Sequence, residues 1–223
     1  MKRFLVLATI LLIRSIPGLS QIPNNSIGTS DPDAKKILDA VTAKFKTYKT
    51  VKAEFTMNIE GSNGKLQASK KGLIYMKDTK YRVSLTGQEI FCDGTTVWTF
   101  DKSSNEVQIS QYDPTTSAIT PQKLFSNFYD KDFLYKQNAD KKQGGKTIQE
   151  IELTPVDKTK AFFKALVFID KATRNIVGTK VFEKNGNRYS YMVSKFSPNA
   201  KIDDSMFSFD PKKYPGVEVI DLR

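Results

Sequence analysis

The chain has 223 residues, of which 39% are hydrophobic and 26% charged, and its formal net charge is +11 at pH 7. This composition is typical of a globular protein with one domain or two small ones, and the mean hydropathy of −0.42 excludes repeated membrane spans. The chain has no histidine and one cysteine, which excludes Ser-His-Asp and Cys-His catalysis, the commonest zinc sites and an internal disulfide. It also lacks a phosphate-binding loop, a dinucleotide fingerprint and a nucleophile elbow, so we expect a protein that is not an enzyme and uses no cofactor or metal.

Residues 1–20 have the pattern of a secretory signal peptide. Lys2 and Arg3 precede the apolar run FLVLATILLI, and Arg14 and the SIPGLS segment follow it. The apolar run would form about 15 Å of helix, half of a hydrocarbon core of roughly 30 Å, so it is too short for a membrane anchor. We expect cleavage near Ser20, which leaves a single domain over residues 21–223 and lowers the net charge from +11 to +8.

The remaining excess of lysine has two interpretations. It indicates an anionic partner, such as a membrane surface or an acidic protein, whereas nucleic acid fits poorly because the protein is exported and its lysines are scattered. Lysine also keeps the surface of a β-rich protein soluble and protects its strand edges. Composition alone does not decide between the two.

The segment SDPDAKKILDAVTAKFKTY predicts one amphipathic helix. Asp31 is a suitable N-cap and Pro32 a suitable first helical residue. The apolar residues recur at the spacing of one helix face: Ala34, Ile37, Leu38, Val41, Phe45 and Tyr48.

After the helix the hydrophobic pattern changes to period two. Residues 51–60, VKAEFTMNIE, alternate between apolar and polar side chains, which predicts a strand with one buried face. Similar runs continue almost to the C-terminus, and Gly72 within the second of them predicts a bulge or a sharp bend. Residues 113–132, with Pro114 and Pro121, interrupt the pattern and predict a loop and a short helix that lies on the sheet.

These elements predict a mainly β fold with helices. About ten or eleven antiparallel strands would curl into an unclosed barrel, with the helices across its mouth. Large apolar strand residues are candidates to line a cavity there: Phe55, Met57, Ile59, Ile74, Met76, Ile90, Trp98, Phe168, Phe182 and Tyr191. The alternative is that they fill a solid core, and the residue pattern by itself favours that core. A register slip of one residue would reverse the face that each strand buries.

The stretch IFCDGTTVWTFD holds the only cysteine and the only tryptophan. Asp93-Gly94 between two alternating runs predicts a hairpin with a type I′ turn, in which both central residues have positive φ. Nothing predicted nearby activates the thiol, because a neighbouring carboxylate disfavours the thiolate and there is no histidine. We therefore interpret Cys92 as a small strand residue and Trp98 as an apolar wall of the cavity.

The order of these parts resembles the LolA-like family of periplasmic outer-membrane lipoprotein carriers. The matching segments are the opening helix, VKAEFTMNI, KGLIYMKDTKYRVSL, QEIFCDGTTVWTFD and the tail FSFDPKKYPGVEVIDL. They run from about Asp33 to Asp221, and Asp-Gly followed by Val-Trp and Phe-Asp is the most specific part. The resemblance implies an unclosed β-barrel with a helical lid over a hydrophobic cavity, and it favours the cavity over the solid core.

The resemblance also implies a function. A periplasmic monomer of this family shields the acyl chains of lipoproteins that an inner-membrane ABC transporter releases, and it moves them to the outer membrane. Whether an outer-membrane receptor takes over the cargo stays open. The mobile apolar lid would be LFSNF, with Leu124, Phe125 and Phe128.

One position departs from the family pattern. Family members usually carry Arg-Pro where this chain has Lys77-Asp78, and that arginine helps to fasten the lid. Lys77 and Arg82 are the basic residues that match the motif, although lysine lacks the two-pronged geometry of arginine. The departure supports an alternative from another class: a periplasmic sensor or regulatory domain of the same fold, which binds a lipid or a protein without transport. Catalysis by carboxylates such as Asp93 or Asp101 is a weaker third reading, because such residues mostly serve turns.

Overall fold

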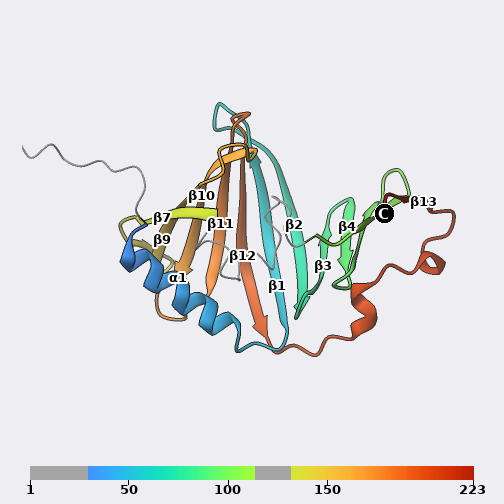
Figure 1. The fold of residues 1–223 in the computed structure, drawn as a ribbon, viewed down its shortest axis with the longest axis horizontal. Coiled ribbons are helices and arrows are strands. Elements are labelled where there is room, and N and C mark those ends of the chain that lie inside the picture. Colours follow the sequence, from blue (N-terminus) through green and yellow to red (C-terminus); the bar gives the residue numbers. More distant parts are fainter. Residues whose placement is uncertain (1–29, 114–131) are drawn as a thin grey trace, which may run out of the picture.

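The computed structural model describes residues 30–113 and 132–223, and within them thirteen strands form one sheet (Figure 1). The strands are β1 (Val51–Glu60), β2 (Leu66–Lys77), β3 (Lys80–Leu85), β4 (Gln88–Cys92), β5 (Thr96–Asp101), β6 (Glu106–Gln111), β7 (Phe133–Gln137), β8 (Lys141–Gln143), β9 (Lys146–Pro155), β10 (Phe162–Asp170), β11 (Ile176–Glu183), β12 (Arg188–Pro198) and β13 (Glu218–Asp221). Their spatial order is β13-β6-β5-β4-β3-β2-β1-β12-β11-β10-β9-β7, with β8 paired to β9. All pairs are antiparallel except β13 with β6.

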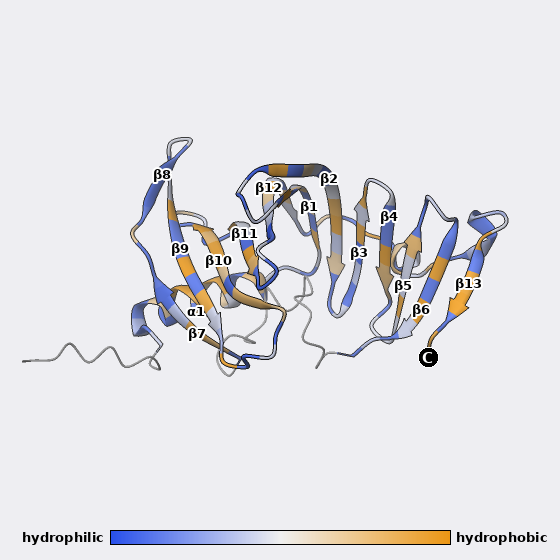
Figure 2. Cartoon of the chain, turned by 90° about the horizontal axis from the view of Figure 1, so that it is seen from above, coloured by the Kyte–Doolittle hydropathy of each residue, from blue (hydrophilic) through white to orange (hydrophobic). Residues whose placement is uncertain are grey.

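The sheet is curved and does not close on itself, since β13 and β7 stand at its two ends (Figure 2). The predicted mainly β, unclosed architecture is therefore confirmed, with more strands than the ten or eleven expected. The extra strands are the short ones, such as β8 and β13, whose sequences are too brief to show alternation. The predicted signal peptide and the predicted lid residues Leu124, Phe125 and Phe128 lie outside the described residues.

The predicted amphipathic helix is α1, Pro32–Phe45. Its N-cap Asp31 accepts hydrogen bonds through Oδ1 from the amides of Asp33 and Ala34, at 2.8 and 3.4 Å. The other carboxylate oxygen accepts from the Gln137 amide of β7 at 3.1 Å, so this residue both starts the helix and ties it to the sheet. The pKa of Asp31 is lowered, first by that bond from Gln137.

The sheet presents two faces, and α1 lies on only one of them. Directly opposed residues of paired strands share a face, so the register assigns each residue to a side. Ile151 and Val167, opposed on β9 and β10, pack against the helix and define what we call the inner face. The register extends this face from Val167 across β11 and β12 to Met57 of β1.

The opposite, outer face carries the C-terminal segment. Two short 3-10 helices, η1 (Asp204–Phe207) and η2 (Pro211–Lys213), lead along it to β13 at the sheet edge. Phe209 packs there against Phe91 of β4 and Phe100 of β5, with ring centroids 5.7 and 5.5 Å apart. This segment therefore gives the β4–β6 region a hydrophobic core of its own on the outer side.

Two local predictions need correction. The bulge predicted at Gly72 is absent, because the register of β1 with β2 passes through Gly72 without a shift and the irregularity of this pair lies near Glu60. The alternative, a sharp bend at Gly72, stays a prediction. Gly72 serves to admit the ring of Phe55, since a Cβ there would lie 2.2 Å from that ring. The hairpin between β4 and β5 is present, but its loop has three residues and only Gly94 has positive φ, because Asp93 Oδ1 accepts hydrogen bonds from the Thr95 and Thr96 amides.

Candidate functional site

The inner face carries two hydrophobic clusters, and α1 packs mainly on one of them. The first lies between the helix and strands β7 and β9–β11, where Leu38 and Val41 are 4% and 5% exposed. The second spreads over β1–β5 and β12 and meets the helix only near its end, at Phe45 and Tyr48. We call the second cluster the apolar platform. Its members are Phe45, Tyr48, Val51, Phe55, Met57, Ile74, Met76, Tyr81, Val83, Leu85, Ile90, Cys92, Val97, Tyr112, Tyr191 and Phe196.

The strand register builds the platform in rows. One row crosses five strands, with Val51, Met76, Tyr81, Cys92 and Val97 opposed in turn. The next row contains Ala53, Ile74, Val83 and Ile90. The first row is almost wholly buried, whereas most platform residues nearer the middle of the strands are only partly buried. The platform thus offers a continuous apolar surface whose cover by described residues is incomplete.

Seven of the ten predicted cavity residues lie on the inner face: Phe55, Met57, Ile59, Ile74, Met76, Ile90 and Tyr191. All except Ile59 belong to the platform, and Ile59 continues the same face toward the end of β1, opposite Tyr189. The structure thus brings these seven together on one surface, which is the geometry that the alternation predicted. Their role in binding stays a prediction.

The other three predicted cavity residues lie on the outer face, so they cannot line a site with the first seven. Trp98 packs beside Phe91 and Phe100 under the C-terminal segment. Phe168 is opposed to Gly178, and Phe182 lies among basic side chains. Strands β5, β10 and β11 carry apolar residues on both faces, so alternation could not orient them and side-chain size was misleading.

Several platform residues were missing from the prediction, among them Val51, Val83, Leu85 and Phe196. Val51 stands in the same alternating run as Phe55, and Val83 and Leu85 alternate in the run of β3, so the period-two rule would have found these three. Phe196 could not be found in this way. It shares a face with Tyr191, an odd number of residues away, only because the pairing of β1 with β12 has a register shift between Glu54 and Phe55. Phe45 and Tyr48 were placed on the helix stripe, but the structure shows that they also contact Phe196 of β12, with Tyr48 and Phe196 rings 5.6 Å apart.

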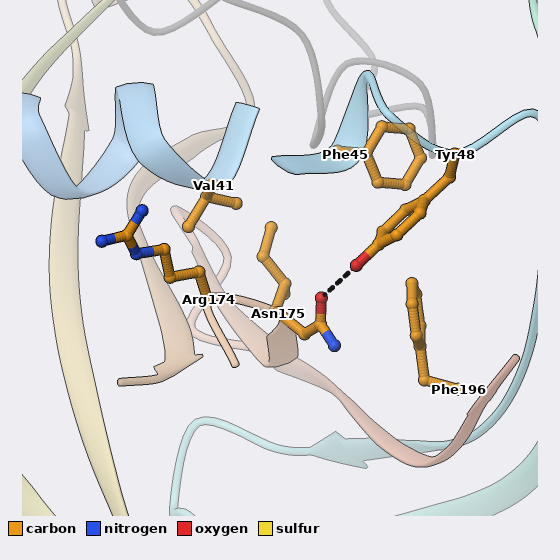
Figure 3. Close-up of a pocket in the computed structure, with 7 residues that line it drawn as sticks. Val41, Phe45, Tyr48, Arg174, Asn175 and Phe196 are labelled. Carbon is orange, nitrogen blue, oxygen red and sulfur yellow. Dashed lines mark hydrogen bonds between the residues drawn. The ribbon is translucent and has the colours of Figure 1, made fainter. Parts of the chain in front are cut away.

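A small pocket lies where α1 ends (Figure 3). Val41, Phe45, Tyr48, Arg174, Asn175, Ile176 and Phe196 line it. The Tyr48 hydroxyl donates to Asn175 Oδ1 at 3.0 Å, which fixes the end of the helix region against the turn before β11. The pocket has a volume of about 10 Å³, which suits a single water molecule. This pocket is therefore too small for an acyl chain, and the platform is the surface on which one could lie.

The single cysteine is a structural residue. Cys92 is fully buried on the inner face opposite Tyr81, and burial raises the pKa of its thiol. Burial also raises the pKa of the Tyr81 phenol. Both groups therefore stay neutral near pH 7 and present an uncharged surface to the platform.

The two residues predicted to fasten a lid lie on the outer face. The Lys77 ammonium contacts Asp204 of η1 at 2.6 Å, and Lys80 reaches the same carboxylate at 3.0 Å. Arg82 pairs with Glu89 at 2.6 Å and covers the ring of Phe91. These contacts fasten the C-terminal segment and the outer side of β3 and β4, so the placement of Lys77 and Arg82 gives no support to a role at a lid on the inner face.

Two features are absent from residues 30–113 and 132–223. These residues contain no helix long and apolar enough to cross a membrane. They also contain no group of three or more Cys, Asp or Glu side chains arranged to hold a metal ion.

Comparison with known proteins places this architecture in a family. The family model described as outer membrane lipoprotein carrier protein LolA matches residues 38–210, most of the chain. This chain therefore belongs to the LolA family. No curated protein matches it.

Several solved structures are similar to this chain at low sequence identity, and the first of those described here shares its fold. An uncharacterized conserved protein from Thermus thermophilus superposes with a TM-score of 0.58 at 12% identity, covering 85% of this chain and 99% of that one. The Mycobacterium tuberculosis lipoprotein LppX gives a TM-score of 0.46 at 15% identity, covering 78% and 99%. A LolA superfamily protein from Nitrosomonas europaea gives 0.42 at 12% identity, covering 79% and 97%.

Proposed function

We propose that this protein is a periplasmic carrier whose apolar platform binds the acyl chains of lipoproteins during their transfer from the inner to the outer membrane. The observation that carries the proposal is the unequal cover of the inner face. Helix α1 covers the cluster over β7–β11, and the platform over β1–β5 keeps Met57, Ile74 and Ile90 only partly buried. The match of residues 38–210 to the lipoprotein carrier family supports the same reading.

The chemistry of the platform suits acyl chains. Its side chains are aliphatic or aromatic apart from the thiol of Cys92, and burial raises the pKa of that thiol and of the tyrosine hydroxyls, so these groups stay uncharged. Each methylene group that leaves water contributes about 0.8 kcal/mol. Binding spread over many weak contacts, without bond cleavage, also permits release at a second membrane.

The binding step is tested by two substitutions at adjacent positions of β2. Ile74 faces the platform and Leu73 faces outward, opposite Ser84, and both are partly buried. We expect Ile74→Asn to weaken binding of a fluorescent fatty acid about five- to ten-fold, because it removes apolar contact area. Leu73→Asn should change the affinity less than about two-fold. Equal effects of the two substitutions would contradict binding at the platform, and mass spectrometry of lipid bound to the purified protein would identify the native ligand.

The transport step needs a test in cells. Depletion of the protein should leave lipoproteins in the inner membrane, where a lipoprotein-releasing ABC transporter is the proposed donor, and an outer-membrane receptor is the candidate acceptor. A different outcome is normal lipoprotein sorting after depletion, in a protein that binds the fatty acid and loses affinity on Ile74→Asn. That outcome would identify a lipid-binding domain without transport.

A further inference from the structure

Three turns meet at one end of the sheet, away from the end where α1 passes into β1 (Figure 1). The Lys184 amide of the β11–β12 turn donates to the Ala161 carbonyl of the β9–β10 loop at 2.9 Å. Gly186 of the same turn, at φ +92°, lies against Ser62 of the β1–β2 turn. Residues 60–66, 156–164 and 180–188 thus form one continuous surface, which we call the turn-end surface.

The turn-end surface exposes large apolar side chains. Leu66 is 61% exposed, and Val156 and Phe163 are each 51% exposed. They are three of the five large hydrophobic residues that are exposed in the described part of the chain, and each comes from this one end. Such a concentration of exposed apolar groups marks an interaction site.

The turn-end surface is also rich in basic residues. The three segments contain seven basic and three acidic residues, a net charge of +4, and the bordering Asp132 lowers this only to +3. One of the acids, Glu60, is already paired with Lys180 at 2.8 Å. Lys164 and Arg188 lie over the ring of Phe182, at 4.6 and 5.7 Å from its centroid. These contacts keep the two charges beside Phe182, on the outer face of the sheet.

We propose that the turn-end surface docks on anionic lipid bilayers. Exposed leucine, valine and phenylalanine side chains on a lysine-rich surface match the chemistry of a membrane interface, where apolar groups enter the headgroup region and cations meet acidic lipids. The excess of positive charge provides the complementarity to anionic lipid. This inference goes beyond the proposed function and does not depend on it, since it concerns the outer rim of the sheet and not the platform.

The test is vesicle co-sedimentation with the protein lacking residues 1–20, the predicted signal peptide, which retains every described element. The protein should bind vesicles of phosphatidylcholine with phosphatidylglycerol and bind pure phosphatidylcholine weakly. Lys65→Gln with Lys160→Gln should weaken binding to the anionic vesicles, by about five-fold per lysine. Added salt should weaken it further. Leu66→Ser should also reduce binding, whereas Leu222→Ser, at a similarly exposed position on the sheet edge, should not.

A matched charge control is available at the opposite end of the sheet. Lys49→Gln with Lys201→Gln removes the same charge from exposed positions beside the start of β1 and the end of β12. Equal losses in this pair and in the turn-end pair, or no preference for anionic vesicles, would overturn the proposal. Ile74→Asn should leave vesicle binding intact, so failure of docking and failure of acyl-chain binding at the platform can be told apart.

Discussion

Glu89 shows how one charged residue is kept on the outer face of this sheet. Its side chain is only 10% exposed, and it accepts contacts from Arg82 and Lys102, each at 2.6 Å. Burial alone would raise the pKa of this carboxyl, but the hydrogen bonds from Lys102 and Arg82 outweigh burial and bring the pKa below its ordinary value of 4.5. The carboxylate therefore stabilises the fold as an ion, and Arg82 depends on it for charge balance.

The pH dependence follows from the direction of that shift. Because the pKa of Glu89 is lower in the folded protein than in the unfolded chain, its stabilising contribution is complete above about pH 4.5 and is lost as the pH falls through the folded value. We expect Glu89→Gln to lower the free energy of unfolding by about 1–3 kcal/mol at neutral pH. Urea titrations of the wild-type protein and of Glu89→Gln at a series of pH values should show that the difference in their free energies of unfolding becomes smaller below about pH 4. A difference in free energy of unfolding that stays constant across this pH range would contradict a stabilising role for the ionised Glu89 carboxylate.

At the scale of the element, α1 is the part whose position decides how much of the inner face stays open. Its N-cap Asp31 is bonded to β7 through the Gln137 amide, and the Asp31 amide donates to the Tyr135 carbonyl at 2.9 Å. At the other end, Tyr48 reaches Asn175 and Phe196. Both ends of this helix region are therefore attached to the sheet, and the helix is held over β7–β11.

Asp31→Ala tests the attachment of the helix. The substitution removes the cap and the side-chain bond to β7, so we expect the free energy of unfolding to fall by about 1–2 kcal/mol. Asp33→Ala is a suitable control, because Asp33 is exposed and its ion pair with Lys36 is also exposed. Chemical denaturation of the two variants should show the larger loss for Asp31→Ala. Equal losses would mean that the cap and the bond to β7 add little.

At the scale of the whole molecule, the two faces of the sheet have separate cores. The inner face is closed in part by α1, whereas the outer face of β4–β6 is closed by the C-terminal segment that ends in β13. Phe207 is fully buried in that segment, and Phe209 stacks on Tyr214 with ring centroids 4.4 Å apart. The β4–β6 region is therefore stabilised by the core on the outer face, and the platform lies on the inner face.

Phe209→Ala should separate stability from binding. The substitution empties part of the outer core and should lower the free energy of unfolding by about 3–5 kcal/mol. Because Phe209 is on the opposite face from the platform, the folded protein should keep its affinity for a fluorescent fatty acid. Val219→Ala, at a residue of β13 that is 49% exposed, should have little effect on either quantity. A loss of affinity in folded Phe209→Ala would show that the two faces are coupled.

Local sequence patterns predict the elements of this fold, but not the orientation of every strand. The helix, the β-rich sheet and the seven inner-face residues follow from local patterns of period 3.6 and period two. Trp98, Phe168 and Phe182 were misplaced because their strands are apolar on both sides, and alternation then carries no information about direction. The roles of Lys77 and Arg82 were likewise out of reach, since their partners Asp204 and Glu89 could be found only from the pairing of strands and the return of the C-terminal segment.

By itself, the sequence determined the fold class, the start of α1, the hairpin at Asp93-Gly94 and the inertness of Cys92, because each depends on neighbouring residues and on composition. Only the tertiary structure decided the orientation of the strands that are apolar on both faces. It also decided that α1 and the C-terminal segment cover opposite faces, and that three distant turns meet at one end. The physical reason is that burial depends on contacts between strands far apart in the chain, and local periodicity does not specify those contacts.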